Sequence, residues 1–237
     1  MAALGDVDNK DVWVIVRCYN EASVVASVIR ELRAEFPKVV GVDDGSSDGS
    51  GKLMAEAGAR VVRHSVNLGA GAALQTGVEY ALLDPSAAYL VCFDADGQHR
   101  VSDALDMVTR SRSEGFDLLV GSRFLGTAPT GMPFTRKAVL RAGRLFERAT
   151  TGVALSDAHN GLRVLSRRFA SGLALTSSDM SYATELLEAA VASRARYGEH
   201  AVEIRYSPYS LAKGERSINS VNIAFDVLVR ALLGRRR

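Results

Sequence analysis

The sequence predicts an α/β fold, with a mostly parallel central sheet and helices on both of its faces. Short apolar segments suited to strands alternate with segments of helical periodicity along the first half of the chain. Parallel strands need crossover connections, and helical crossovers cover the faces of the sheet. The chain has 237 residues, of which 47% are hydrophobic and 24% charged. This length and composition are typical of a globular protein with a substantial core.

The first half of the chain contains five expected strands. Each is a short run rich in Val, Ile, Leu or aromatic residues, and polar or glycine-containing segments bound it. We expect these strands at residues 12–18, 39–42, 60–64, 89–93 and 117–122.

Helices are expected between these strands. In the first of them Val25, Val28, Ile29 and Leu32 recur at helical spacing and form one apolar face. The others are expected at residues 51–58, 71–83 and 102–112.

After Phe124 the strand–helix alternation ends. We expect a basic helix over residues 134–150, a helix at 184–195, a strand at 201–207 and an amphipathic helix at 221–233. No repeat or low-complexity linker separates these parts. We therefore expect one domain over residues 1–237, in which residues 218–237 form an amphipathic helix facing a membrane or a partner.

Composition narrows the class of protein. Cys18 and Cys92 both lie in apolar runs, which predicts buried reduced thiols in a cytoplasmic protein. The opening residues 1–12 lack the apolar stretch of a signal peptide, and no run reaches the roughly 18 apolar residues of a membrane span. A net charge of +2 does not indicate nucleic-acid binding. We expect a soluble or peripheral protein that binds no nucleic acid.

Polar segments follow every one of the five strands. In order they read CYNE, DDGSSDGS, HSVNLG, FDADGQH and GSR. Ligands of open α/β sheets gather outside the carboxyl ends of the strands, so these segments predict a binding site. SSDGSGKL is not a P-loop, because Ser46 replaces the first glycine and Leu53 the Ser/Thr. GAGAAL lacks the third glycine of a dinucleotide fingerprint.

The segment after the fourth strand carries oxygen ligands at alternate positions, in Asp94, Asp96 and Gln98. Two carboxylates this close repel each other and are costly to desolvate. A hard cation such as Mg²⁺ or Mn²⁺ removes that repulsion and can bridge to a diphosphate. The alternative is an acidic turn in which Asp96-Gly97 makes the bend. The polar ends of the other strands favour the metal site.

The ordered set of segments resembles the inverting GT-A glycosyltransferases of family two. The segments are VIVRCYNEA, VDDGSSDGS, NLGAGAALQTG, FDADGQH, GSR and DAHNGLRVLSR, between Val12 and Ser217. They are most similar to the polyprenyl-phosphate sugar synthases, the dolichol-phosphate-mannose and undecaprenyl-phosphate hexose enzymes. The resemblance implies a Rossmann-like GT-A fold and transfer of a hexose from a nucleoside-diphosphate sugar to a polyprenyl phosphate, with inversion, for cell-wall or surface glycan assembly.

The resemblance also implies roles for single residues. Asp94, Asp96 and Gln98 would hold the metal and the donor diphosphate, and Asp96, Arg123 and Asp157 would be the catalytic residues. The implied nucleotide-sugar site consists of Cys18, Tyr19, Asn20, Glu21, Asp44, Asp94 and Ala95. The implied acceptor-phosphate ligands are Arg123, Lys137, Arg163 and Lys213. For Tyr19, Asn20 and Asp44 the alternative is turn chemistry at strand ends.

The chain departs from the family pattern at several positions. Arg17 replaces a usual proline, Ala70 replaces the lysine of NxGKG, and Arg216 replaces the serine of KGxS. Arg17 changes the turn after the first strand, and Ala70 removes a phosphate contact. No QxxRW segment is present, which argues against a processive polysaccharide synthase.

The acceptor decides whether the reaction needs a base. A lipid phosphate is already anionic near neutral pH, whereas a sugar hydroxyl on a lipid-linked glycan must lose a proton. Asp157 is then the candidate base. A third hypothesis is a non-catalytic nucleotide-sugar-binding subunit. The set Asp94, Asp96 and Gln98 argues against it, because such a subunit does not need metal ligands. The sequence names neither the sugar nor the nucleotide.

Two helical segments indicate a site of action at a membrane. Lys137, Arg141, Arg144 and Arg148 form one basic face, suited to anionic headgroups or an acceptor phosphate. The segment 221–233 has an apolar stripe and precedes three terminal arginines. We expect a peripheral enzyme at the inner face of the plasma membrane, with a small membrane protein or a second copy as a candidate partner. Solvated helix faces and ordinary core packing are the alternatives.

Overall fold

The computed structural model describes residues 8–125, 155–177 and 181–205. In this part of the chain seven strands form one sheet, in the order β3-β2-β1-β4-β6-β5-β7. All neighbouring pairs are parallel except the two that β6 makes with β4 and β5. The strands are β1 (Val12–Cys18), β2 (Lys38–Asp43), β3 (Arg60–Arg63), β4 (Tyr89–Asp94), β5 (Leu118–Ser122), β6 (Arg163–Ser166) and β7 (Tyr197–Ala201).

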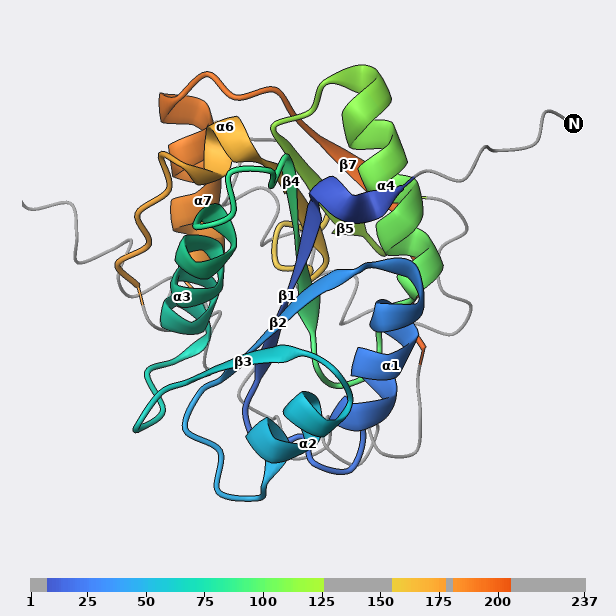
Figure 1. Cartoon of the computed structure of the whole chain (residues 1–237). Helices are drawn as coiled ribbons and strands as arrows, with labels where there is room; N and C mark the ends of the chain where they lie inside the picture. The colour runs from blue at the N-terminus through green and yellow to red at the C-terminus, as the bar shows by residue number, and fades with distance from the viewer. Residues whose placement is uncertain (1–7, 126–154, 178–180, 206–237) are drawn as a thin grey trace, which may run out of the picture.

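Helices cover both faces of this sheet, as the alternating sequence predicts (Figure 1). The apolar residues of α1, α2 and α4 pack with Val12, Val14 and Val16 of β1. Those of α3, α6 and α7 pack with Trp13 and Ile15 of the same strand. The bounds are α1 (Val25–Glu35), α2 (Ser50–Glu56), α3 (Ala70–Leu82), α4 (Val101–Glu114), α6 (Arg167–Ala170) and α7 (Tyr182–Ala192), with a 3₁₀ turn at Asn9–Asp11.

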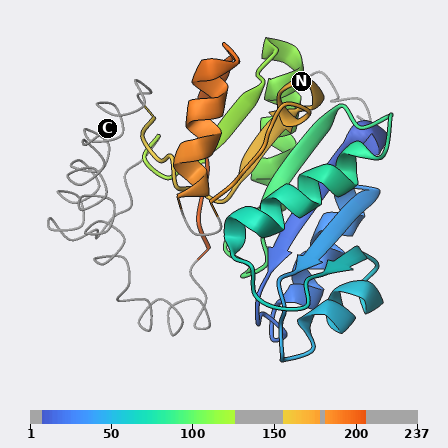
Figure 2. The same cartoon turned by 90° about the vertical axis from the view of Figure 1, so that its left-hand side faces the viewer.

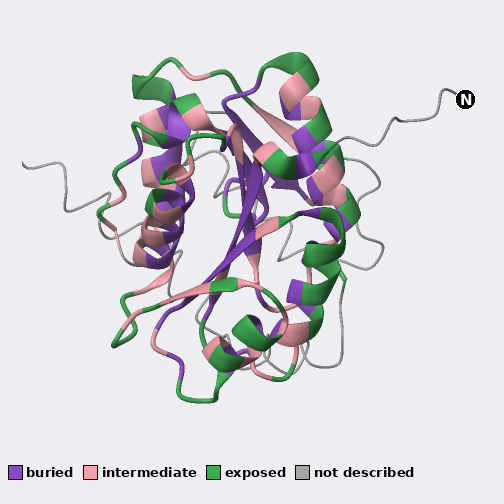
Figure 3. Ribbon diagram, viewed as in Figure 1, coloured by how far each residue is buried: buried purple, intermediate pink, exposed green. Residues whose placement is uncertain are grey.

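Strand β1 alternates between the two cores because successive side chains of a strand point to opposite faces. The central strands are almost entirely buried, and the exposed residues lie on the outer sides of the helices (Figure 3). Trp13 is buried, and its indole N–H donates to Asp84 Oδ2 at 2.9 Å. Cys18 and Cys92 are buried free thiols, as expected.

The region after Phe124 differs from the sequence prediction. The expected strand at 201–207 is wrong, because the strand is β7 at Tyr197–Ala201, and residues 202–205 form no strand. The reason is that β7 is a partly exposed edge strand whose position depends on backbone pairing with β5 rather than on hydropathy. Strand β6 and helix α6 were not predicted. The predicted helices at 134–150 and 221–233 lie outside the described residues.

Helix α7 begins two residues before the predicted 184–195 segment and ends at Ala192, and it stands beside α3 (Figure 2). Among the described residues, no helix combines the length and apolar character that a bilayer crossing requires.

The strand order changes direction between β1 and β4, because β2 follows β1 on one side and β4 lies on the other. Such a switch point is where the loops after two strands diverge and leave room for a ligand. The loops after β1 and β4 carry CYNE and DADGQH. The fold therefore puts these two polar segments on either side of one crevice.

Candidate active site

A cavity of about 440 Å³ opens at the carboxyl ends of β1, β2 and β4. It brings together six of the seven predicted nucleotide-sugar residues and the predicted metal ligand Asp96; the six are Cys18, Tyr19, Glu21, Asp44, Asp94 and Ala95. The rest of its lining comes from the start of α3, the loop before β6 and the start of α7. Those residues are Asn67, Gly69, Ala70, Ala73, His159, Gly161 and Tyr182, together with Arg17 of β1.

Asp44 fixes the loop that borders the cavity. Its carboxylate accepts hydrogen bonds from the backbone N–H groups of Leu68 and Gly69, both at 2.8 Å. It also lies 2.7 Å from His64 Nδ1, and His64 Nε2 lies 3.0 Å from Thr76 on α3. These contacts hold the turn between β3 and α3. The predicted contact of Asp44 with the nucleotide sugar stays a prediction.

The loop after β1 is held against the loop after β2. Asn20 has a left-handed φ of 55°, its backbone N–H donates to Ser46 Oγ at 3.0 Å, and its side-chain oxygen accepts from the Ser47 N–H at 2.9 Å. Glu21 is buried and its backbone N–H donates to Ser50 Oγ at 2.9 Å. Asn20 thus joins two loops and does not line the cavity, whereas Tyr19, which is 49% exposed, does.

Cys18 lies at the base of this loop and lines the cavity. Burial raises the pKa of its thiol to about 12. The side chain is therefore neutral at physiological pH, and it contributes shape rather than charge.

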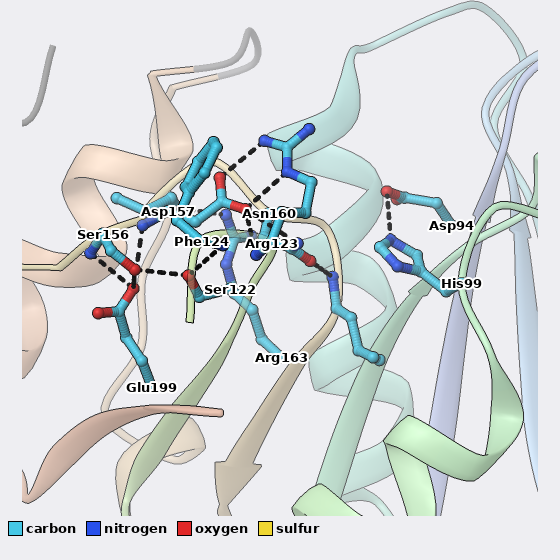
Figure 4. Close-up of polar contacts among 12 residues, drawn as sticks. Asp94, His99, Ser122, Arg123, Phe124, Ser156, Asp157, Asn160, Arg163 and Glu199 are labelled. Carbon is cyan, nitrogen blue, oxygen red and sulfur yellow. Dashed lines mark hydrogen bonds and ion pairs between the residues drawn. The ribbon is translucent and has the colours of Figure 1, made fainter. Parts of the chain in front are cut away.

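Asp94, at the end of β4, has protein partners on both oxygens. Arg17 forms an ion pair with Oδ1. His99 Nε2 lies 3.3 Å from Oδ2 (Figure 4). Desolvation opposes ionisation, but the attraction of Arg17 and the His99 hydrogen bond together hold the pKa of Asp94 below its usual range. Asp94 is therefore a fixed anion at the cavity wall.

Gly161 makes room for that carboxylate. A Cβ at this position would lie 1.7 Å from Asp94 Oδ2 and 2.6 Å from Asp94 Cγ. Any side chain here would displace Asp94, so the site requires glycine at residue 161.

Asp96 has a freer carboxylate than Asp94. Its Oδ1 accepts the Gln98 backbone N–H at 3.0 Å, which closes the turn. Desolvation and the neighbouring Asp94 charge raise the pKa of Asp96. Both carboxylates line the cavity, while Gln98 is half-buried in the same turn and does not line it.

These oxygen donors fit a hard divalent cation. Asp94 and Asp96 offer carboxylate oxygens on one wall, which suits Mg²⁺ or Mn²⁺. The described residues contain no group of three or more His, Cys, Asp or Glu side chains that could hold an ion. A cation would therefore need further oxygens, such as those of a diphosphate, to complete its coordination.

Arg123 and Asp157 form a second polar cluster at the end of β5 (Figure 4). Arg123 Nε and Nη2 donate to the two oxygens of Asp157 at 2.6 and 2.7 Å, and the Arg123 backbone N–H donates at 3.0 Å. Asn160 Nδ2 lies 3.3 Å from Asp157 Oδ2. The structure brings these two predicted catalytic residues together, but neither lines the cavity. Their catalytic roles stay predictions.

Arg163 lies beneath the cavity, where its side chain is fully buried. Its Nη1 donates to the Tyr182 hydroxyl at 3.0 Å and its Nη2 to the Ala158 carbonyl at 2.9 Å. Its predicted contact with the acceptor phosphate stays a prediction. Lys137 and Lys213, the other predicted phosphate ligands, lie outside the described residues.

Several lining residues were not assigned to the site from the sequence. Arg17 stood out as a departure from the family pattern, and Gly161 lies in the DAHNGLRVLSR segment that carries the resemblance, whereas Tyr182 carried no signal of its own. Glu185, on α7, does not line the cavity. Its carboxylate accepts the backbone N–H groups of Thr176 and Ser177 at 2.9 and 3.1 Å, so it orders the segment before α7.

The described residues have a GT-A-like fold. In crystals of glucosyl-3-phosphoglycerate synthase from Mycobacterium tuberculosis with Mn²⁺ and UDP-glucose, the fold matches with a TM-score of 0.65 at 18% identity. The match covers 95% of this chain and 79% of that chain.

The family follows from the sequence comparison. A model described as glycosyl transferase family 2 matches residues 13–172, and the chain belongs to that family. It is 27% identical to the UDP-N-acetylglucosamine–dolichyl-phosphate N-acetylglucosaminyltransferase of Methanococcus voltae, over 95% of this chain and 96% of the relative. It is 29% identical to the polyprenol monophosphomannose synthase of Mycolicibacterium smegmatis, over 70% of this chain and 65% of the relative. The protein is an enzyme, a family 2 glycosyltransferase, as the sequence predicts.

Proposed function

We propose that this enzyme moves a hexose from a nucleoside-diphosphate sugar to a polyprenyl phosphate, with inversion at the anomeric carbon and with Mg²⁺ or Mn²⁺ as cofactor. One observation carries the proposal: Asp94 and Asp96 line the same cavity as the loops after β1 and β2. The names of the two relatives, which specify dolichyl phosphate and polyprenol monophosphomannose, support the acceptor class.

The residues of the cavity would bind and orient the donor. Tyr19 and Glu21 border the side toward β2, where the base and ribose would lie, and Asp94 and Asp96 border the diphosphate side. A divalent cation held there by Asp94 and Asp96 would stabilise the negative charge of the departing nucleoside diphosphate. Arg17, His99 and Arg163 keep Asp94 ionised, and the ion pair with Arg17 holds it in place.

The state of Asp157 supports a phosphate acceptor over a sugar hydroxyl. A general base must be accessible to the acceptor hydroxyl and within hydrogen-bond reach of its proton, whereas Asp157 does not line the cavity. Both Asp157 oxygens accept hydrogen bonds from Arg123, and the carboxylate is buried. A lipid phosphate is already anionic and needs no such base. Asp157 would then hold Arg123 in position at the edge of the site.

We also propose that the reaction takes place at the inner membrane surface, with the protein bound peripherally as a single domain. A polyprenyl phosphate is a membrane lipid, so its phosphate must be reached at the headgroup level. Flotation with liposomes that contain anionic lipid tests this. We expect the protein in the floated fraction at low salt, alone or with a small membrane partner. Protein that remains in the dense fraction under both conditions would contradict membrane binding.

A donor screen tests the proposed reaction. The enzyme is incubated with radiolabelled UDP- and GDP-hexoses and undecaprenyl phosphate, with and without Mn²⁺. We expect label in the organic extract for one donor, a strong decrease with chelator, and a decrease of at least 100-fold in Asp96→Asn, of the size seen when electrostatic stabilisation is lost. Label that requires a glycan-bearing lipid would favour a sugar hydroxyl acceptor. Turnover untouched by chelator would refute the metal-dependent mechanism.

A further inference from the structure

Arg17 places a positive charge inside the wall of the donor cavity. Arg17 on β1 and Asp94 on β4 are register partners of adjacent parallel strands, and the guanidinium forms an ion pair with Asp94 Oδ1. The other terminal nitrogen donates to the Tyr182 hydroxyl. The Arg17 side chain is only 9% exposed, and its Nε has no hydrogen-bond partner in the described residues. An arginine this buried is held in one place by its partners.

The surroundings of Arg17 add to its effect on Asp94. Arg17 Cζ and Arg163 Cζ each lie 5.1 Å from the centre of the Tyr182 ring. Asp94 also has His99 Nε2 at 3.3 Å from its second oxygen. The protein itself therefore compensates the charge of Asp94, and both Asp94 oxygens already have partners. Among the described residues, the nearby Asp96 carboxylate accepts a hydrogen bond from the Gln98 N–H alone.

We propose that Arg17 is a positioning residue that lowers the affinity of the empty site for a divalent cation, by competing with the cation for Asp94. A fixed positive charge at the carboxylate repels an incoming divalent ion and reduces the charge that attracts it. The ion is then held mainly through Asp96 and the donor diphosphate, so it enters with the nucleotide. The link to the nucleotide rests on the proposed function, but the competition for Asp94 does not.

Titration of the full-length protein with Mn²⁺ alone, followed by the EPR signal of free Mn²⁺, tests the competition directly. We expect Arg17→Met and Arg17→Gln to bind Mn²⁺ at least tenfold more tightly than the wild type. Arg17→Lys keeps a cation beside Asp94 and should stay within threefold of the wild type. A variant that is merely damaged would lose affinity, so a gain separates competition from a structural role.

Arg63→Met is the matched control. Arg63 is also a strand-end arginine paired with a strand-end aspartate, with Arg63 Nε 3.4 Å from Asp43 Oδ2. It does not line the cavity, and its side chain is 66% exposed. We expect its Mn²⁺ affinity to stay within twofold of the wild type, because it removes the same charge without contacting Asp94.

Unchanged or weaker Mn²⁺ binding in both Arg17→Met and Arg17→Gln would overturn the inference. The same titrations repeated with UDP or GDP distinguish this failure from failure of the proposed function. If neither nucleotide binds any of the proteins, with or without Mn²⁺, the donor site is wrong. The Mn²⁺-only result still decides the role of Arg17 in that case.

Discussion

Asp94 depends on the absence of a side chain at Gly161. The close approach of Gly161 to Asp94 is steric and involves no positive φ. We therefore expect Gly161→Ala to fold but to displace the Asp94 carboxylate by a distance comparable to an ångström. Misplacement of that size costs about 100-fold in rate. The measurement is lipid-extractable label in the donor assay.

Gly172→Ala is the control for this substitution. A Cβ at Gly172 meets only Phe169 O at 3.8 Å, which is ordinary contact. Its activity should equal that of the wild type. Wild-type turnover in Gly161→Ala would show that the position of Asp94 does not matter for the reaction.

Asp157 contributes to stability through its ion pair with Arg123. In Asp157→Asn the amide no longer balances the Arg123 charge, although Arg123 is 31% exposed and can be partly solvated. We expect a loss of about 1–3 kcal/mol in the free energy of unfolding, measured in urea. Glu56→Gln, which breaks an exposed helix pair with Lys52, should cost less than about 0.5 kcal/mol.

The same Asp157→Asn variant tests for base catalysis at this position. If it retains most of its turnover, base catalysis at this position is excluded. A loss of turnover would leave both base catalysis and positioning of Arg123 as explanations, and the pH dependence of the rate would separate them.

At the scale of elements, β7 anchors the segment that carries Asp157. Glu199 Oε1 accepts three hydrogen bonds, from the Ser156 backbone N–H at 2.6 Å, the Ser156 hydroxyl at 2.7 Å and the Asp157 backbone N–H at 2.9 Å. This edge strand therefore connects the end of the sheet to the second polar cluster. The connection explains how β7, a strand of mostly polar residues, contributes to the site.

Removing that carboxylate should loosen the segment. We expect Glu199→Ala to lower the free energy of unfolding by about 1–3 kcal/mol, because it leaves partly buried backbone donors without a partner. Glu199→Gln keeps an oxygen acceptor and should lose less. Glu203→Ala, whose side chain is 69% exposed beside Arg100, is the control and should be nearly neutral in urea unfolding. Equal stability of Glu199→Ala and Glu203→Ala would contradict the anchoring role.

At the scale of the whole molecule, hydrogen-bonded aspartates make stability depend on pH. Partial burial opposes ionisation of Asp117, but hydrogen bonds from Arg168, the Arg196 N–H and Ser166 lower its pKa. The Lys38 ammonium and the Trp13 indole likewise lower the pKa of Asp84. Asp117, next to β5, accepts hydrogen bonds from the end of β6 and from the residue before β7. Asp84, which follows α3, accepts hydrogen bonds from β1 and β2.

A depressed pKa in the folded state gives stability that is complete above the unfolded pKa, about 3.9 for Asp, and that is lost as the pH falls through the folded value. We expect the melting temperature to fall between pH 5 and pH 3. Asp117→Asn should be less stable at pH 7 and show a flatter acid profile. Asp106→Asn, at an exposed position of α4, should follow the wild type. A melting temperature that stays constant to pH 3 would contradict this account.

Local patterns in the sequence predict much of the fold. Three predicted strands agree with the structure to within a residue: 12–18 with β1, 39–42 with β2 and 89–93 with β4. The predicted helix that contains Val25 is α1. Strand β6 was missed because it has only four residues and inserts antiparallel between β4 and β5. Its place depends on pairing with strands far away in the chain.

The sequence by itself determined the α/β class, the polar strand ends and the acidic turn at Asp94 and Asp96, because these follow from periodicity and from residue types that are neighbours in the chain. Only the tertiary structure decided which polar residues share a cavity. Glu21 lines the cavity, whereas Asn20 makes loop contacts instead. Asp157 pairs with Arg123, and Arg17 pairs with Asp94. The physical reason is that such pairings depend on strand register and on packing between segments far apart in the chain, which no local pattern specifies.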